Sequence, residues 1–297
     1  MVQTKRGLNV PSAQDFLANM LRVRPTDALQ VFYRLCVLEN VWEPVTLVQS
    51  AQATMKAIRT NNPSVPGNER MVELTDRWYA SLNNGSGPDF GVYDSPLYLA
   101  EAFACWAVYS RSYLLGLEKP QNLPPKGIAA DLGYKGYPYS IVDLGCGIGF
   151  STAGLAQLFP WATVTGTNVP DSPQTRIAKR VADPYGRGQP RFGMVAELSD
   201  LAGTPCLVFA SEYFEHFQEP VAHLHEVIDA LEPEALLIAN TFTNPSIGHF
   251  DTYKVAGAEL TGAQTSQAFN NELPANGSTK VPTKLWNNRP AYWKKVG

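Results

Sequence analysis

The segment IVDLGCGIGFST, residues 141–152, carries three glycines at alternate positions directly after a short β-branched run. The run predicts a buried strand, and Asp143 stands near its end. Gly145, Gly147 and Gly149 remove three side chains in succession, so the backbone can adopt conformations that other residues avoid. The pattern therefore predicts a strand-to-helix turn whose backbone is approached closely by a ligand.

From residue 140 onward, short β-rich runs alternate with helix-length segments. Strands are predicted at 140–144, 163–168, 192–195, 206–211 and 235–242, and helices at 151–159, 174–182 and 221–231. Such alternation implies right-handed crossovers and a parallel sheet that binds ligands at the carboxyl ends of its strands. The glycine loop follows the first predicted strand and so lies at that edge.

The part of the chain before residue 136 has a helical pattern. Apolar residues recur at helical spacing over 12–23 and 26–41, and a further helix is predicted from Pro96, capped by Asp94 or Ser95. An aromatic stripe follows on that helix: Tyr98, Phe103, Trp106, Tyr109 and Tyr113. We therefore divide the chain into a helical region, 1–135, and an α/β domain, 136–297.

Composition limits the classes of protein that fit. The net charge of −3 argues against a surface built throughout for nucleic acid, although it allows a local basic patch. Four cysteines without a CxxC pair predict free thiols in a reducing compartment. The sequence shows neither a signal peptide nor a membrane span, so the prediction is a cytoplasmic protein.

The glycine spacing argues against two common kinds of nucleotide-binding loop and favours a different ligand. Gly145-x-Gly147-x-Gly149 differs from the GxGxxG of dinucleotide sites, and no GK[ST] follows. Together with Asp143, it resembles the first motif of the class I S-adenosylmethionine-dependent methyltransferases. The resemblance covers residues 140–243, about a third of the chain. It implies an enzyme with a Rossmann-like α/β fold: a mostly parallel seven-stranded sheet, an antiparallel last strand and an N-terminal helical extension.

The same resemblance assigns the cofactor S-adenosylmethionine to Asp143, the three glycines and residues after the later strands. Asn168 stands where the family has a carboxylate for the ribose hydroxyls; an amide accepts hydrogen bonds but carries no charge. Asp171 is the alternative. Ala196 and Glu197 fall in the region that faces the adenine, although Glu197 is equally explained as a solvated loop charge. Ser211, at the end of the fourth strand, completes the predicted set.

The segment SEYFEHFQEP, residues 211–220, resembles the part of the family that faces the transferred methyl group. Its E-x-x-E-H spacing resembles the small-RNA terminal ribose O-methyltransferases and, more loosely, ubiquinone-pathway O-methyltransferases. The resemblance implies His216 and Glu215 as catalytic residues. It also implies a divalent ion (magnesium, manganese or zinc) held by Glu212, Glu215, His216 and His249. The alternative is His216 alone as a base or orienting group.

Two further histidines lie on the next predicted helix. His223 and His225 are two positions apart and cannot share a helix face, so they are predicted to be surface or packing residues.

The C-terminal residues allow two interpretations. After Glu272 there is no acidic residue, and lysines alternate with aromatics such as Trp293. Basic and aromatic residues together can bind a nucleic-acid strand. The segments VPTKLW, 281–286, and AYWKKV, 291–296, also fit a terminal antiparallel hairpin with the aromatics inward. The hairpin is the preferred interpretation.

The sequence thus predicts an S-adenosylmethionine-dependent methyltransferase, acting on the oxygen of a small-molecule or ribose hydroxyl. A nucleic-acid methyltransferase and a non-catalytic scaffold that keeps the fold are the alternatives. The helix 97–117 is predicted to cover the carboxyl edge of the sheet and to line an acceptor pocket; packing on a far face or a dimer contact is the alternative.

Overall fold

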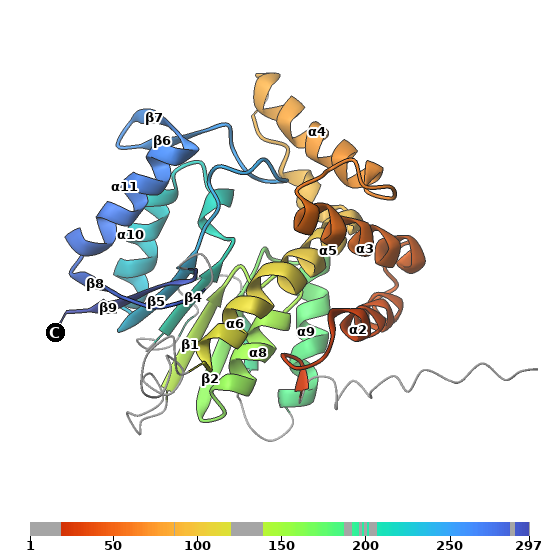
Figure 1. Cartoon of the computed structure of the whole chain (residues 1–297), viewed down its shortest axis with the longest axis horizontal. Coiled ribbons are helices and arrows are strands. Elements are labelled where there is room, and N and C mark those ends of the chain that lie inside the picture. The colour runs from red at the N-terminus through yellow and green to blue at the C-terminus, as the bar shows by residue number, and fades with distance from the viewer. Residues whose placement is uncertain are drawn as a thin grey trace, which may run out of the picture.

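A seven-stranded sheet forms the centre of the molecule, in the order β3-β2-β1-β4-β5-β9-β8 (Figure 1). The computed structural model describes residues 19–85, 87–119, 139–186, 192–195, 198, 201, 207–285 and 289–296. The strands of this sheet are β1 (Tyr139–Leu144), β2 (Ala162–Thr167), β3 (Phe192–Val195), β4 (Leu207–Ser211), β5 (Ala235–Ala239), β8 (Ser278–Val281) and β9 (Ala291–Lys295).

The strand directions confirm the predicted class I topology. β1 pairs in parallel with β2 and β4, and β5 pairs in parallel with β4. The last strand, β9, is antiparallel to both of its neighbours, β5 and β8. Because β2 and β3 lie on one side of β1 while β4 and β5 lie on the other, the strand order reverses next to β1. Open α/β sheets bind ligands at such a point.

Helices cover both faces of the sheet. They are α8 (Phe150–Leu158), α9 (Pro173–Gly186), α10 (Pro220–Leu231) and α11 (Gly262–Ala275). Along β4, Leu207 and Phe209 join a buried cluster with Leu155 of α8, whereas Val208 joins a second cluster with Leu224 of α10. A strand buried on both faces is apolar without alternation, as the β4 sequence is.

The N-terminal helices pack beside this sheet (Figure 1). They are α2 (Pro25–Leu38), α3 (Pro44–Thr60), α4 (Glu69–Asn83), the 3₁₀ turn η1 (Phe90–Asp94), α5 (Pro96–Cys105), the π-helical turn η2 (Trp106–Ser110) and α6 (Arg111–Leu117). Ser95 caps α5 by accepting from the amide of Leu97, with Pro96 in the first turn. Phe32 of α2 packs on Phe103 of α5 with ring centroids 5.0 Å apart.

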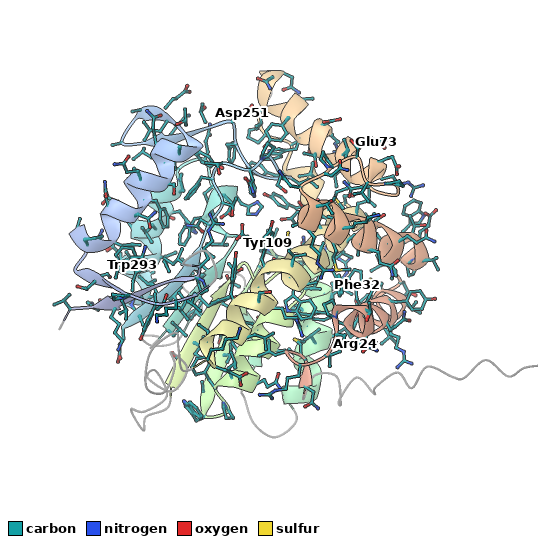
Figure 2. All side chains as sticks on the ribbon, in the orientation of Figure 1. Arg24, Phe32, Glu73, Tyr109, Asp251 and Trp293 are labelled. Atoms are coloured by element: carbon teal, nitrogen blue, oxygen red, sulfur yellow. The ribbon has the colours of Figure 1, made fainter. Side chains whose placement is uncertain are left out.

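Figure 2 shows how the labelled side chains are distributed over these elements: Arg24 just before α2, Phe32 on α2, Tyr109 on η2, and Trp293 on β9. Phe32 is fully buried and Trp293 nearly so, whereas the charged Arg24 is exposed.

The C-terminal hairpin exists, but its first strand lies earlier in the chain than predicted. β8 spans Ser278–Val281 rather than 281–286 and pairs with β9. Tyr292 and Trp293 are buried against their neighbours, so neither ring is available for stacking on a base.

The hairpin of β6 (Thr252–Val255) and β7 (Ala258–Thr261) and helix α11 were not predicted. Their one clear sequence signal is the capping box at Thr261, whose side chain accepts from the amide of Gln264 while the Gln264 side chain accepts in return.

Some predictions fall on residues that the structure does not describe. These include most of the helix at 12–23, Cys206, and the domain boundary at 135. Cys36, Cys105 and Cys146 are not joined in disulfides. Within the described ranges, helices are all too short or too polar to cross a bilayer.

Candidate functional site

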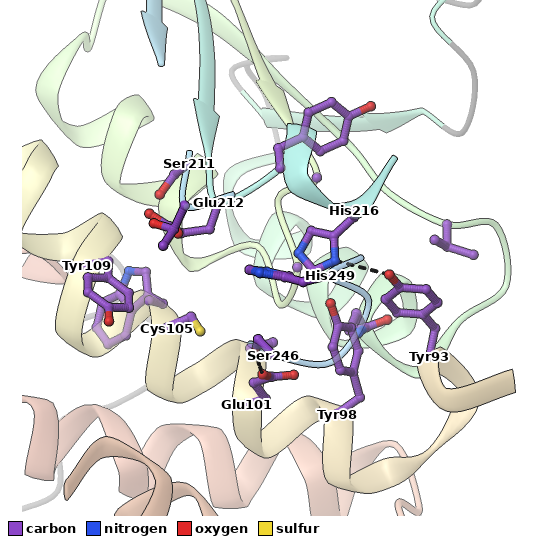
Figure 3. Close-up of a pocket in the computed structure, with 18 of the residues that line it drawn as sticks. Tyr93, Tyr98, Glu101, Cys105, Tyr109, Ser211, Glu212, His216, Ser246 and His249 are labelled. Atoms are coloured by element: carbon purple, nitrogen blue, oxygen red, sulfur yellow. Dashed lines mark hydrogen bonds between the residues drawn. The ribbon is translucent and has the colours of Figure 1, made fainter. Parts of the chain in front are cut away.

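A cavity of about 1600 Å³ lies at the carboxyl ends of β1, β2, β4 and β5 and extends between them and helices α3, α4 and α5. The glycine loop lines one end of it, and His216 and His249 line the part shown in Figure 3. The cavity therefore joins the ligand edge of the sheet to side chains that the N-terminal helices contribute.

The glycine loop needs glycine at each of its three positions. Gly145, Gly147 and Gly149 have φ angles of +60°, +56° and +80°, which L side chains rarely adopt. A Cβ on Gly145 would collide with the ring of Tyr213, and one on Gly149 would lie 3.0 Å from the backbone of Ala178 in α9. At Gly147 the nearest atom would be 3.7 Å away. This backbone is a cradle that stays open toward the cavity.

Asp143 ties the end of β1 to the start of α8. Its buried carboxylate accepts hydrogen bonds from the hydroxyls of Ser151 and Thr152 at 2.7 and 2.6 Å. Burial raises the pKa of Asp143 to about 7, although both hydroxyls favour the ionised form. Asp143 lines the cavity beside the glycines.

The end of β2 holds the glycine loop in place. The Asn168 amide donates to the carbonyl of Gly147 at 2.7 Å, and its oxygen accepts from the amide of Val169 at 3.0 Å. The Thr167 hydroxyl accepts from the amide of Gly145. Asn168 lines the cavity as well, so its contact with a ribose stays a prediction while its support of the loop is observed.

The remaining predicted cofactor residues divide into two groups. Ser211 lines the cavity at the end of β4 and shares a 2.9 Å hydrogen bond with Ser110 of η2. Ala196 and Glu197 lie outside the described residues.

Two imidazoles meet in the cavity. His216 and His249 lie edge to face with ring centroids 5.0 Å apart. Nδ1 of His216 shares a 3.1 Å hydrogen bond with the Tyr93 hydroxyl (Figure 3). Nδ1 of His249 donates to the carbonyl of Asn244 at 2.8 Å. Burial lowers the pKa of His249 to about 4; burial and the neighbouring His249 lower the pKa of His216 well below its usual value. Both rings are therefore neutral at pH 7.

A glycine makes room for this arrangement. Gly248 has a φ of +81°, and a Cβ there would collide with both the Tyr93 hydroxyl and Nδ1 of His216. The Tyr93–His216 hydrogen bond thus depends on the residue next to His249 in the chain.

The four predicted metal ligands do not form a ligand set. Glu215 is fully buried and is absent from the cavity lining, and its carboxylate accepts from the amide of Thr241 at 2.8 Å. Burial and the nearby Glu212 raise its pKa well above the usual value. Glu212 itself accepts from the Tyr113 hydroxyl. Across the described residues, no cluster of three or more His, Cys, Asp or Glu side chains is arranged to hold an ion.

Glu215 is not available as a metal ligand because its carboxylate joins the loop after β4 to the chain just after β5. Its carboxylate is hydrogen-bonded inside the protein, and among the described residues it joins neither His216 nor His249 in a metal-binding cluster. The observed role of Glu215 is thus structural, and its part in catalysis stays a prediction.

A chain of hydrogen bonds that sequence reasoning missed lies beside the glycine loop. The Tyr213 hydroxyl bonds to Nε2 of His223 at 2.8 Å, and Nδ1 of His223 bonds to Glu226 at 2.8 Å. The His223 ring stacks on Phe217 with centroids 3.8 Å apart. His223 thus positions the tyrosine that covers Gly145. The i,i+3 spacing of His223 and Glu226 was the available signal.

The aromatic helix lies over the glycine loop. Tyr98, Trp106 and Tyr109 line the cavity, and Phe103 packs against Phe150 at the start of α8. The predicted placement of this helix at the carboxyl edge of the sheet is thus observed. Its part in substrate selection stays a prediction.

Comparison with known proteins identifies the central part of the chain. Residues 142–239 match the profile of a family described as a methyltransferase domain. No curated protein matches the sequence. The fold is similar to mitomycin 7-O-methyltransferase MmcR at 14% identity and a TM-score of 0.47, over 79% of this chain and 70% of that one.

Two further solved structures are similar at the same level. The S-adenosylmethionine-dependent methyltransferase SibL is 16% identical, with a TM-score of 0.46 over 88% of this chain and 76% of that one. Magnesium protoporphyrin IX methyltransferase ChlM from Synechocystis PCC 6803 is 14% identical, with a TM-score of 0.38 over 74% of this chain and 94% of that one. Residues 142–239 therefore form a methyltransferase domain, and its strand order and glycine loop are those that the class I resemblance predicts.

Proposed function

We propose that this protein transfers a methyl group from S-adenosylmethionine to a hydroxyl or amine of a small organic acceptor. The observation that carries the proposal is one continuous cavity, which joins the glycine cradle to the neutral pair His216 and His249. The acceptor would lie between α5 and the loops that follow β4 and β5.

The size of the cavity supports two ligands. Binding pockets for single small molecules are about 300–1,000 Å³. At about 1600 Å³, this cavity exceeds that range and extends from the Gly147 cradle to Phe90 and Met71 of the N-terminal region. A cofactor at the glycine end leaves room for an acceptor of substantial size.

The cofactor, when bound, supplies an electrophilic methyl group on a positively charged sulfur. The protein would align the acceptor and remove its proton. His216 is the candidate to receive that proton because it is neutral, lines the cavity and is hydrogen-bonded to Tyr93. The ring of Tyr213, held by His223, would close the site beside Gly145. No metal ion has a part in this proposal.

The first test measures cofactor binding. Calorimetric titration with S-adenosylmethionine should show a saturable site that Gly147→Asp abolishes, because a carboxylate side chain would enter the open cradle. Binding without transfer to any acceptor would favour the scaffold alternative, and absence of binding by the folded wild-type protein would contradict the proposal.

The second test measures transfer of a labelled methyl group to a library of small metabolites. His216→Gln should lower turnover at least about 100-fold, since general-base catalysis contributes that much or more. His225→Gln is the matched control, because His225 bonds to Glu272 on α11 and does not line the cavity. Equal loss in both variants would exclude His216 as the base.

A further inference from the structure

The charged residues around the cavity are of one sign. Among the described residues that line it, Asp and Glu supply six side chains, and Lys and Arg supply none. The six are Asp76, Asp94, Glu101, Asp143, Glu212 and Glu226. Arg289 donates to the Thr241 hydroxyl but is not part of the lining. With both histidines neutral, nothing in this lining offers a counter-charge to an anionic ligand.

Glu101 is the acidic residue whose position is hardest to explain by folding alone. It lies in the apolar helix α5 and is 8% exposed. Burying a carboxyl group is unfavourable unless partners satisfy it. One of its oxygens accepts from the Ser246 hydroxyl at 2.6 Å, while the other, Oε2, is buried without a hydrogen-bond partner.

Among the residues that the structure describes, no cation influences the pKa of Glu101. Burial is the main influence on its pKa, which it raises to about 7, and the Ser246 hydroxyl is the only opposing one. The charge of Glu101 contributes to the raised pKa values of Tyr93, Tyr98 and Cys105. Each of these three residues lines the cavity and would lie against a ligand there. Figure 3 shows Glu101 facing the same space as Tyr98 and His249.

Because unsatisfied buried polar atoms are uncommon in folded proteins, Oε2 calls for a partner that binding supplies. A protonated amine or a similar cationic donor fits, since it would form a charge-assisted hydrogen bond and neutralise the carboxylate at once. The aromatic rings of Tyr93 and Tyr98, which lie edge to face 4.8 Å apart, provide an apolar wall for the rest of the molecule.

We infer that the acceptor is an amine-bearing aromatic or apolar small molecule, bound through its cationic group to Glu101, and that phosphorylated, carboxylated and nucleic-acid acceptors are rejected. This inference rests on the proposed function, since it names the substrate class of that same site.

Three phenols that differ in the charge of their side group test this inference: tyramine (cationic), tyrosol (neutral) and para-hydroxyphenylacetate (anionic). Their dissociation constants would be measured by ligand-detected NMR, with and without S-adenosylhomocysteine. Wild-type protein should bind tyramine tightest and para-hydroxyphenylacetate weakest. Glu101→Gln should weaken tyramine about tenfold or more and leave tyrosol unchanged, as expected when a charged hydrogen-bond partner is lost.

Asp76→Asn is the matched control, because it removes the same charge from an exposed residue of the cavity lining. It should leave the order of the three phenols unchanged. The Glu101→Gln protein must unfold cooperatively at a temperature no lower than the wild type, which shows that its binding loss is local.

The inference is overturned if the anion binds as well as the cation, if Glu101→Gln leaves the preference intact, or if tyramine fails to bind at millimolar concentration. S-adenosylmethionine titrations on the same samples separate the two proposals. If tyramine is preferred but S-adenosylmethionine does not bind, only the proposed function is contradicted. If S-adenosylmethionine binds but the anionic phenol is preferred, only the assignment of Glu101 is contradicted.

Discussion

At the scale of single residues, the site depends on glycines whose absent side chains leave space for side chains that line the cavity. Gly145 admits the ring of Tyr213, and Gly248 admits the hydrogen bond between Tyr93 and His216. Sequence reasoning recognised the first glycine through its motif. Gly248 belongs to no motif, and only the packing of three separate segments shows why it is there.

Gly248→Ala provides a sharp test, because the chain contains a matched control. Gly257 has the same φ of +81°, but a Cβ there would have nothing within 4 Å. Gly257→Ala should therefore cost only the backbone strain, about 1–2 kcal/mol of unfolding free energy. Gly248→Ala should cost clearly more and should shift the His216 ring resonances in NMR spectra. Equal costs in urea unfolding would contradict the crowding of Gly248.

Glu101 should make stability depend on pH. Its pKa is about 7 in the folded protein against 4.5 for the ordinary side chain, so the folded state binds more protons between these values. The carboxyl contributes no penalty below about pH 4.5 and its full penalty above about pH 7.

The variant Glu101→Gln removes that penalty. Its stability relative to wild type should rise as pH increases from about 4.5 to 7, by about 3 kcal/mol at most, and stay level above pH 7. Urea unfolding of both proteins across this range measures the difference. A constant difference would show that Glu101 titrates normally in the folded protein.

At the scale of elements, the loop between β4 and α10 is fixed from both sides. Glu215 joins it to the end of β5 through the Thr241 amide, and Tyr213 joins it to α10 through His223. The E-x-x-E-H segment therefore does two jobs: Glu215 secures the loop, and His216 faces the cavity. Spacing alone does not distinguish these two directions, because a 3₁₀ turn at Phe214–His216 separates neighbouring side chains.

The capping box at the start of α11 is an element-scale feature with a clear expected effect. Thr261→Ala should lower the free energy of unfolding by about 1 kcal/mol, because the amide of Gln264 loses its acceptor. Thr261→Ser keeps the hydroxyl and should stay close to wild type. Thermal unfolding of the wild type and the two variants measures this effect. Equal melting temperatures would show that the capping box does not contribute to stability.

At the scale of the whole molecule, the cavity lies between the N-terminal helices and the sheet, so a bound cofactor should stabilise both parts together. Ligand at about 100 times its dissociation constant adds about 2.7 kcal/mol to the unfolding free energy. Hydrogen exchange with saturating S-adenosylmethionine should slow at the glycine loop and in α5, where Ala102 lies next to Gly147. Protection confined to the loop would indicate that α5 does not close over the cofactor.

The fold class and the glycine loop can be predicted from the amino-acid sequence alone. Alternating β-rich and helical segments define the sheet, because periodicity is a local property, and the glycines at 145, 147 and 149 mark a turn that few other residues can form. Element limits were close: β3 lies at 192–195 as predicted, and α10 begins one residue early.

The part of the cavity around His216 and Glu101 becomes visible only in the folded chain. The Tyr93–His216 bond joins residues 123 positions apart, and the Glu101–Ser246 bond joins residues 145 apart. Periodicity carries no information on such pairs, because their meeting depends on how the N-terminal helices pack over the sheet. The direction of Glu215 likewise follows from its hydrogen bond with the amide of Thr241, because a buried backbone amide needs an acceptor and no motif records this requirement.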